Sequence, residues 1–100
     1  MKIIHIIDSV SWRAALDKGS VGENSLKEYH YVHCCLPDQL TGVLETWFPD
    51  DDNLVVLEIE SDLLTSEVRF ENLEGGRELF PHVYGLINLD AVVKWYPSSS

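Results

Sequence analysis

Short runs of alternating or β-branched hydrophobic residues along the chain predict five or six β-strands. Five segments have the length and residue types of strands: residues 2–7 (KIIHII), 29–34 (YHYVHC), 53–60 (NLVVLEIE), 67–72 (EVRFEN) and 91–96 (AVVKWY). A sixth strand is expected near Val83, although Pro81 makes residues 80–87 irregular, since proline removes a backbone donor from a sheet.

Two segments between these strands have the hydrophobic spacing of helices. Asp8 or Ser9 can cap a helix that Gly19 ends. The clearest helix covers residues 37–48 (PDQLTGVLETWF), where proline suits the first turn and the apolar residues recur on one stripe. Residues 19–28 are polar and contain two glycines, which predicts a loop. These elements predict a single α+β domain over residues 1–96 with a disordered tail over 97–100.

The composition limits the class of partner. The chain has 100 residues, of which 45% are hydrophobic, enough to form a core without a metal or a disulfide. Its formal net charge is −10, and its seven lysines and arginines form no basic cluster, which argues against duplex nucleic acid and anionic membranes. A small anionic ligand is compatible, because one arginine and a few backbone N–H groups can hold a phosphate. Without a signal peptide or an apolar run of about 20 residues, the expected location is the cytoplasm.

The stretch EYHYVHCC (residues 28–35) combines histidines and cysteines and raises the question of a metal site. In a strand, His33 and Cys35 share one face about 6.6 Å apart, so they could supply only two ligands. A structural zinc needs four, usually from two close pairs, and no second pair is present. A metal-dependent protein is the least favoured alternative. Its metal ligands would be His5, His33, Cys35 and His82. Cys34 and Cys35 are expected to be free thiols.

Three histidines are candidate pocket residues, and each has a simpler structural interpretation. His5 lies between isoleucines on an apolar strand face, where it could be a core histidine bonded to a backbone carbonyl. His33 is on the second strand, facing away from Cys34. His82 lies between Pro81 and Gly85, either as a functional residue or in an ordinary aromatic turn. If the strands are neighbours, the three side chains line one cleft.

Arg69 and Glu71 alternate on one face of the predicted strand at residues 67–72. The simpler interpretation is a solvated charge pair that contributes roughly a few tenths of a kcal/mol. The functional alternative is an anion-binding arginine next to a carboxylate that acts as a general base or binds hydroxyl groups.

Several motifs in this order resemble the mainly bacterial family known as domain of unknown function 952. These are IIHII, SVSWRAAL, YVHCCLPDQL, VRFEN and FPHVYG, and the resemblance runs over roughly residues 3–93. The chain departs from the family pattern at Ile4, where an aromatic residue is usual, and at Cys35, where serine is usual. The pattern falls on these residues: His5, Trp12, His33, Cys34, Gln39, Leu40, Glu71, Phe80, Pro81, His82, Tyr84 and Gly85.

The resemblance also implies a remote relation to the ADP-ribosyltransferase fold, with a split antiparallel or mixed sheet of five to six strands and two helices. By that analogy the ligand is NAD or a related ADP-ribosyl or phosphorylated compound, and the chain is an ADP-ribosyl- or phosphotransferase-like enzyme. The implied catalytic residues are His33, Glu71 and His82, and the implied cofactor-binding residues are His5, Trp12, Arg69 and Tyr84. The alternative is a non-catalytic module that binds a small anionic metabolite or a protein.

Overall fold

The computed structural model describes residues 1–73 and 76–98 as an α+β domain. It contains three α-helices, α1 (Ser9–Lys18), α2 (Glu23–Tyr29) and α3 (Leu40–Trp47). The strands are β1 (Lys2–Asp8), β2 (Ser20–Val21), β3 (Val32–His33), β4 (Leu54–Glu60), β5 (Glu67–Glu71), β6 (Phe80–Tyr84), β7 (Ile87–Asn88) and β8 (Val92–Pro97). Single turns of 3₁₀-helix precede α3, follow β4 and precede β8.

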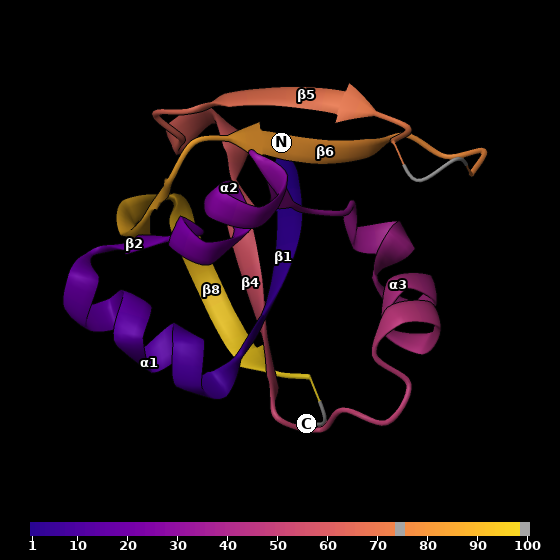
Figure 1. The fold of residues 1–100 in the computed structure, drawn as a ribbon, viewed down its shortest axis with the longest axis horizontal. Helices are drawn as coiled ribbons and strands as arrows, with labels where there is room; N and C mark the ends of the chain where they lie inside the picture. Colours follow the sequence, from indigo (N-terminus) through magenta and orange to yellow (C-terminus); the bar gives the residue numbers. More distant parts are fainter. Residues whose placement is uncertain (74–75, 99–100) are drawn as a thin grey trace.

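The central sheet is antiparallel in the order β1–β4–β8. Consecutive residues of β1 and β4 are buried on both faces of the sheet, whereas much of β8 is exposed. Alternation along β1 sends Ile3 into a core with Trp12 of α1, while Ile4 packs with Val56 and half-buried residues of α3. The helices α1 and α3 accordingly lie on opposite sides of this sheet (Figure 1). The predicted strands at residues 2–7, 53–60 and 91–96 are thereby confirmed within one residue at most ends.

A second antiparallel sheet, β3–β6–β5, lies across one end of the first (Figure 1). The two sheets separate at the adjacent cysteines. The Cys34 N–H donates to the Pro81 carbonyl of β6 at 3.0 Å, whereas Cys35 exchanges two backbone hydrogen bonds with Ile4 of β1 at 2.7 and 2.8 Å. Two consecutive residues therefore connect the two sheets, and the opening between the sheets begins there.

Residues 19–28 are not the loop that their polarity predicts. They form β2, which pairs with β7, and the first six residues of the helix α2. Gly22 precedes α2 with a φ of 113°, a conformation that glycine adopts readily. Leu26 packs against the main core, so tertiary contact stabilises a helix that has no strong hydrophobic stripe of its own.

The predicted strand at residues 29–34 is shorter than expected. Tyr29 ends α2, and His30 follows it with a φ of 70°, so pairing with β6 is confined to Val32 and His33. The predicted helix at residues 37–48 begins as a 3₁₀ turn at Pro37–Gln39 and continues as α3. Gln39 organises this start, because its side chain accepts from the Leu36 N–H at 2.8 Å and donates to the Leu79 carbonyl at 3.1 Å.

The C-terminal part of the chain is more regular than the sequence suggested. Pro81 lies inside β6 and is buried. β8 includes Pro97, and the Ser98 N–H donates to the Leu54 carbonyl at 3.0 Å, so residues 97 and 98 are attached to the sheet and not part of a tail. Residues 99–100 of the predicted tail lie outside the described residues. Among the helices of the described residues, none is long and apolar enough to cross a membrane.

Candidate functional site

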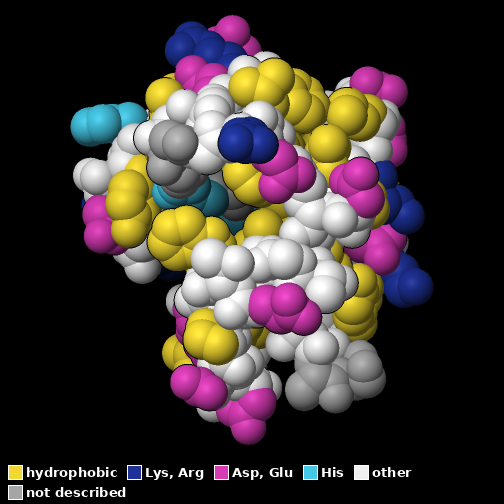
Figure 2. All heavy atoms as spheres, turned by 90° about the vertical axis from the view of Figure 1, so that its right-hand side faces the viewer, with side chains coloured by type: hydrophobic (Ala, Val, Ile, Leu, Met, Phe, Trp, Pro, Cys, Tyr) yellow, Lys and Arg dark blue, Asp and Glu magenta, His cyan; other side chains and the backbone are white. Residues whose placement is uncertain are grey.

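A pocket of about 470 Å³ opens where the two sheets separate. His5 of β1, His33 of β3 and His82 of β6 line it together. The rest of its lining comes from β1, α2, the two cysteines after β3, α3 with the residue that follows it, and β6. It is mostly apolar: Ile4, Ile6, Ser25, Tyr29, Cys34, Cys35, Val43, Trp47, Phe48 and Phe80. Figure 2 shows this face, with histidine side chains in a hollow that hydrophobic side chains surround.

His5 connects the two sheets through its side chain. Its Nδ1 lies 2.6 Å from the backbone carbonyl oxygen of His33. Since a carbonyl oxygen can only accept, Nδ1 carries the proton and donates it. Burial lowers the pKa of His5, which keeps the ring neutral and leaves Nε2 as an acceptor. His5 is therefore a buried histidine bonded to a backbone carbonyl and also lines the pocket, so its two predicted interpretations do not exclude each other.

His33 is part of a cluster of aromatic rings around the pocket. Its ring lies edge-on to Tyr29 and Tyr31, with centroids 4.9 and 4.8 Å apart, and to His82 at 5.5 Å. Tyr31 also stacks on His82 with centroids 4.2 Å apart. These contacts fix the orientation of both histidine rings. The pairing of His33 with His82 in the β3–β6 register brings the two residues together.

His82 is fully buried and bonded to a carboxylate on the neighbouring strand. Its Nδ1 lies 3.0 Å from Oε1 of Glu71, and the Tyr84 hydroxyl donates to the same oxygen at 2.5 Å. Hydrogen bonds from Tyr84 and His82 lower the pKa of Glu71, so the carboxylate is ionised at neutral pH. A carboxylate held against one ring nitrogen orients the imidazole, which is an arrangement that general acid–base catalysis uses.

Four of the seven candidate residues do not line the pocket: Glu71, Tyr84, Arg69 and Trp12. Glu71 and Tyr84 are bonded behind His82. The Arg69 guanidinium stacks on the Tyr84 ring at 4.2 Å and pairs with Glu67 at 2.9 Å, so it is close to the Glu71 group but does not line the cavity. Trp12 is buried in the main core and lies edge-on to Trp95, with centroids 5.6 Å apart. Thus six of the seven candidate residues form one connected group, and Trp12 is separate from it.

Both cysteines are free thiols that border the pocket. Burial raises the pKa of Cys35 to about 12 and that of Cys34 higher still. Both are therefore protonated at neutral pH and poor nucleophiles. Among the described residues, no group of three or more His, Cys, Asp or Glu side chains is arranged to hold a metal ion.

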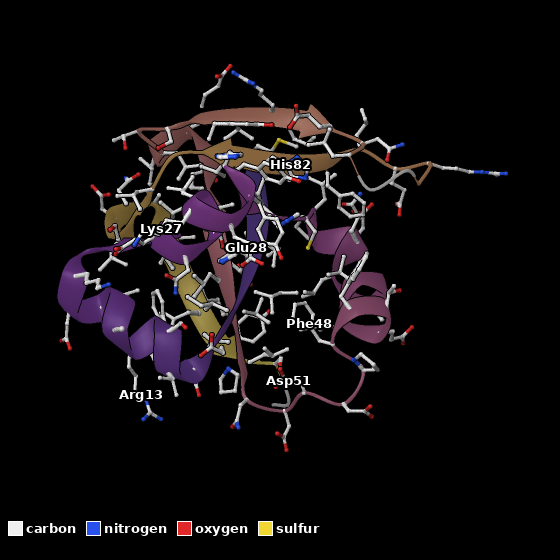
Figure 3. The ribbon with its side chains drawn as sticks, viewed as in Figure 1. Arg13, Lys27, Glu28, Phe48, Asp51 and His82 are labelled. Atoms are coloured by element: carbon white, nitrogen blue, oxygen red, sulfur yellow. The ribbon has the colours of Figure 1, made fainter. Side chains whose placement is uncertain are left out.

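The aromatic and apolar wall of the pocket did not emerge from the sequence as a candidate site. Phe48 follows α3 and lies between that helix and β1 (Figure 3). Trp47 is 63% exposed despite its size, so its position on the predicted buried stripe of α3 was misleading. The available signal was the density of aromatic residues at the end of this helix, which exceeds what packing on one sheet face requires.

Replacing Glu71 with alanine is expected to reduce the folding equilibrium constant by about tenfold. The substitution removes the acceptor that the buried His82 ring and the Tyr84 hydroxyl share. Glu71→Gln is the matched control, because its amide oxygen can still accept from both groups. Urea denaturation followed by tryptophan fluorescence measures the two effects, and equal losses for both variants would contradict this account of Glu71.

The fold is similar to solved structures of CC0527 from Caulobacter crescentus. Its crystal structure has a TM-score of 0.84 and is 26% identical in sequence, with 97% of this chain and 85% of that chain covered. Its solution NMR structure gives a TM-score of 0.81 at 26% identity, covering 96% and 83% of the two chains. No curated protein matches the chain.

The family comparison covers nearly the whole chain. The family model described as Protein of unknown function (DUF952) matches residues 6–95. This range includes the elements that line the pocket except for the start of β1, where Ile4 and His5 lie. This chain therefore belongs to the DUF952 family of proteins of unknown function.

Proposed function

We propose that the pocket between the two sheets binds NAD or a related ADP-ribosyl compound. One observation carries the proposal: histidines from three separate strands line a single pocket with an aromatic wall, next to a histidine–carboxylate pair. A remote relation to the ADP-ribosyltransferase fold is part of this proposal and is consistent with the two separated sheets.

The apolar wall suits the ring of a nucleotide. A volume of about 470 Å³ falls within the range of roughly 300–1,000 Å³ typical of small-molecule sites. Phe48, Phe80 and Trp47 offer flat apolar surfaces, and stacking on such surfaces does not require matched hydrogen bonds.

The histidines suit the sugar and phosphate portion. His5 presents Nε2 as an acceptor, which a ribose hydroxyl can satisfy by donating. His82 is oriented by Glu71 and lines the pocket, but its ring is fully buried. In this proposal, ligand binding opens the pocket enough for His82 to exchange a proton with a hydroxyl or a leaving group during transfer of an ADP-ribosyl or phosphoryl group. Glu71 acts through His82, and Arg69 contributes positive charge beside Tyr84 and Glu71, outside the pocket lining.

A non-catalytic binding module is the second candidate. Among the described residues, no lysine or arginine lines the pocket, and Arg69 is already paired with Glu67. Transfer of a phosphorylated group usually relies on fixed positive charge at the phosphates, so this lining favours binding without turnover. The two candidates predict the same binding site and differ in whether the ligand is consumed.

An amide NMR titration with NAD and ADP-ribose tests the proposal. Saturable shifts are expected at residues of β1, β3 and β6, and His33→Ala is expected to weaken binding by at least about tenfold. His30→Ala is the matched control, because His30 is exposed and outside the pocket. No saturable shifts with either compound, or equal weakening by both substitutions in folded protein, would overturn it.

A further inference from the structure

A second compartment adjoins the histidine-lined pocket on the side of α1. It has a volume of about 420 Å³ and lies between α1, the start of α2 and the loop before β4. The two cavities have four lining residues in common: His5, Ile6, Ser25 and Phe48. The pocket therefore continues past these residues, and a ligand longer than a single ring system can occupy both compartments.

The residues shared by the two compartments form a neck with an available hydrogen-bond acceptor. His5 and Ile6 come from β1, Ser25 from α2 and Phe48 from the end of α3. His5 is only 8% exposed, and its Nδ1 donates to the His33 carbonyl. Within residues 1–73 and 76–98, no hydrogen bond is made to its Nε2. An acceptor that lines both cavities can take a donor from the ligand, such as a hydroxyl group at the neck.

The charges around the second compartment are predominantly negative. Asp8, Glu23 and Asp51 line it, together with Lys18. Lys18 and Lys27 both pair with Glu23, at 3.0 and 3.4 Å, so Asp8 and Asp51 are the carboxylates that face the compartment without a lysine. Hydrogen bonds from Ser11 lower the pKa of Asp8, and hydrogen bonds from Lys18 and Lys27 lower that of Glu23, so both are ionised at neutral pH. A phosphate in this compartment would face like charges, whereas a cation would face opposite ones.

We propose that the second compartment is a subsite for a flat organic cation, such as the pyridinium ring of oxidised NAD, joined through a hydroxyl-bearing linker at His5 to the part held in the first pocket. The inference rests on the proposed function and assigns the two ends of its ligand. Apolar side chains of Ile7, Val21 and Leu54 offer contact to the ring faces, and the Phe48 ring can stack against the cation. The acidic side chains complement its charge.

The test uses two fragments that differ in charge and in a single methyl group. These are 1-methylnicotinamide, a cation, and nicotinamide, which is uncharged at neutral pH, titrated by amide NMR at low salt beside NAD itself. Saturable shifts are expected at Ser11, Asn24 and Ser25, with the cation bound about fivefold more tightly. Glu23→Gln with Asp51→Asn should remove this preference, since both replacements keep the shape and an acceptor oxygen. Glu45→Gln with Asp17→Asn is the control of equal charge, on exposed residues outside both cavities.

The outcomes separate this inference from the proposed function. Equal affinity for the two fragments, shifts confined to the histidine-lined pocket, or the same loss of preference in both double variants would overturn the cation subsite. NAD binding to the first pocket alone would leave the proposed function in place and also overturn the subsite. A fragment preference that follows the expectation, without binding of NAD or ADP-ribose, would support the subsite and overturn the nucleotide proposal.

Discussion

Gly22→Ala is expected to lower the free energy of unfolding by about 3 kcal/mol. Gly22 has a φ of 113°, where a residue with a Cβ is strained. A Cβ placed there would lie 2.5 Å from Cγ2 of Val32, a fully buried residue of β3. Backbone strain and overpacking of the core therefore act together, and neither can be relieved by moving an exposed side chain.

Gly42→Ala is the matched control for this prediction. Gly42 lies within α3 and a Cβ there would have no neighbour within 4 Å, so alanine should stabilise the helix by up to about 1 kcal/mol. Urea denaturation of both variants, followed by circular dichroism, measures the difference. Equal stability of Gly22→Ala and the unmodified chain would contradict the close contact between the start of α2 and β3.

This contact also positions the pocket. Gly22 lets the first turn of α2 approach β3, and the same helix carries Ser25 and Tyr29 to the pocket wall beside His33. In a folded but destabilised Gly22→Ala protein, the amide signals of α2 and β3 should shift together, because the helix must move away from Val32 to make room. The site thus depends on a residue that contributes no chemistry of its own.

The sequence predicted the elements whose hydrophobic pattern is strong. The strand over Leu54–Ile59 and the helix α1 are confirmed because each has a strong local hydrophobic pattern. In α1, Trp12 and Ala15 are buried as that pattern predicts, whereas Leu16 is exposed. The helix α2 was missed, because its residues are polar and its stability comes from Leu26 packing into a core that other segments build. Local pattern cannot reveal such a helix.

The candidate site was predicted residue by residue but not as a geometry. His5, His33 and His82 could be singled out from their unusual positions, yet their proximity depends on the β3–β6 register and on the bridge between Ile4 and Cys35. Both are long-range pairings that no single segment specifies. The Glu71–His82 bond likewise follows from the β5–β6 register, which the alternation of residues 67–71 does not determine.

His5→Phe is expected to lower the free energy of unfolding by about 2 kcal/mol. The phenyl ring fills a similar space, but the His33 carbonyl at the junction of the two sheets loses its donor. His5→Asn is the matched control, because the asparagine amide can donate from a position close to that of Nδ1. Asparagine should therefore recover part of the stability that phenylalanine loses, and equal losses would show that the bond to His33 contributes little.

The same histidine predicts how stability changes with pH. Burial lowers the pKa of His5 below its usual value of 6.5, so below about pH 6.5 the unfolded chain binds a proton that the folded chain does not. As the pH is lowered, the free energy of unfolding should then fall by about 1.4 kcal/mol per pH unit from this residue alone, until the pH reaches the pKa of the folded state.

Urea denaturation between about pH 5.5 and 7.5 measures this slope. That range stays above the pH at which Glu71 and the other carboxylates of lowered pKa begin to take up protons. His5→Asn carries no titrating group at this position and should lose that slope while keeping the hydrogen bond. A slope that persists unchanged in His5→Asn would place the proton uptake on another residue, and would mean that the His5 ring is not held neutral between the sheets.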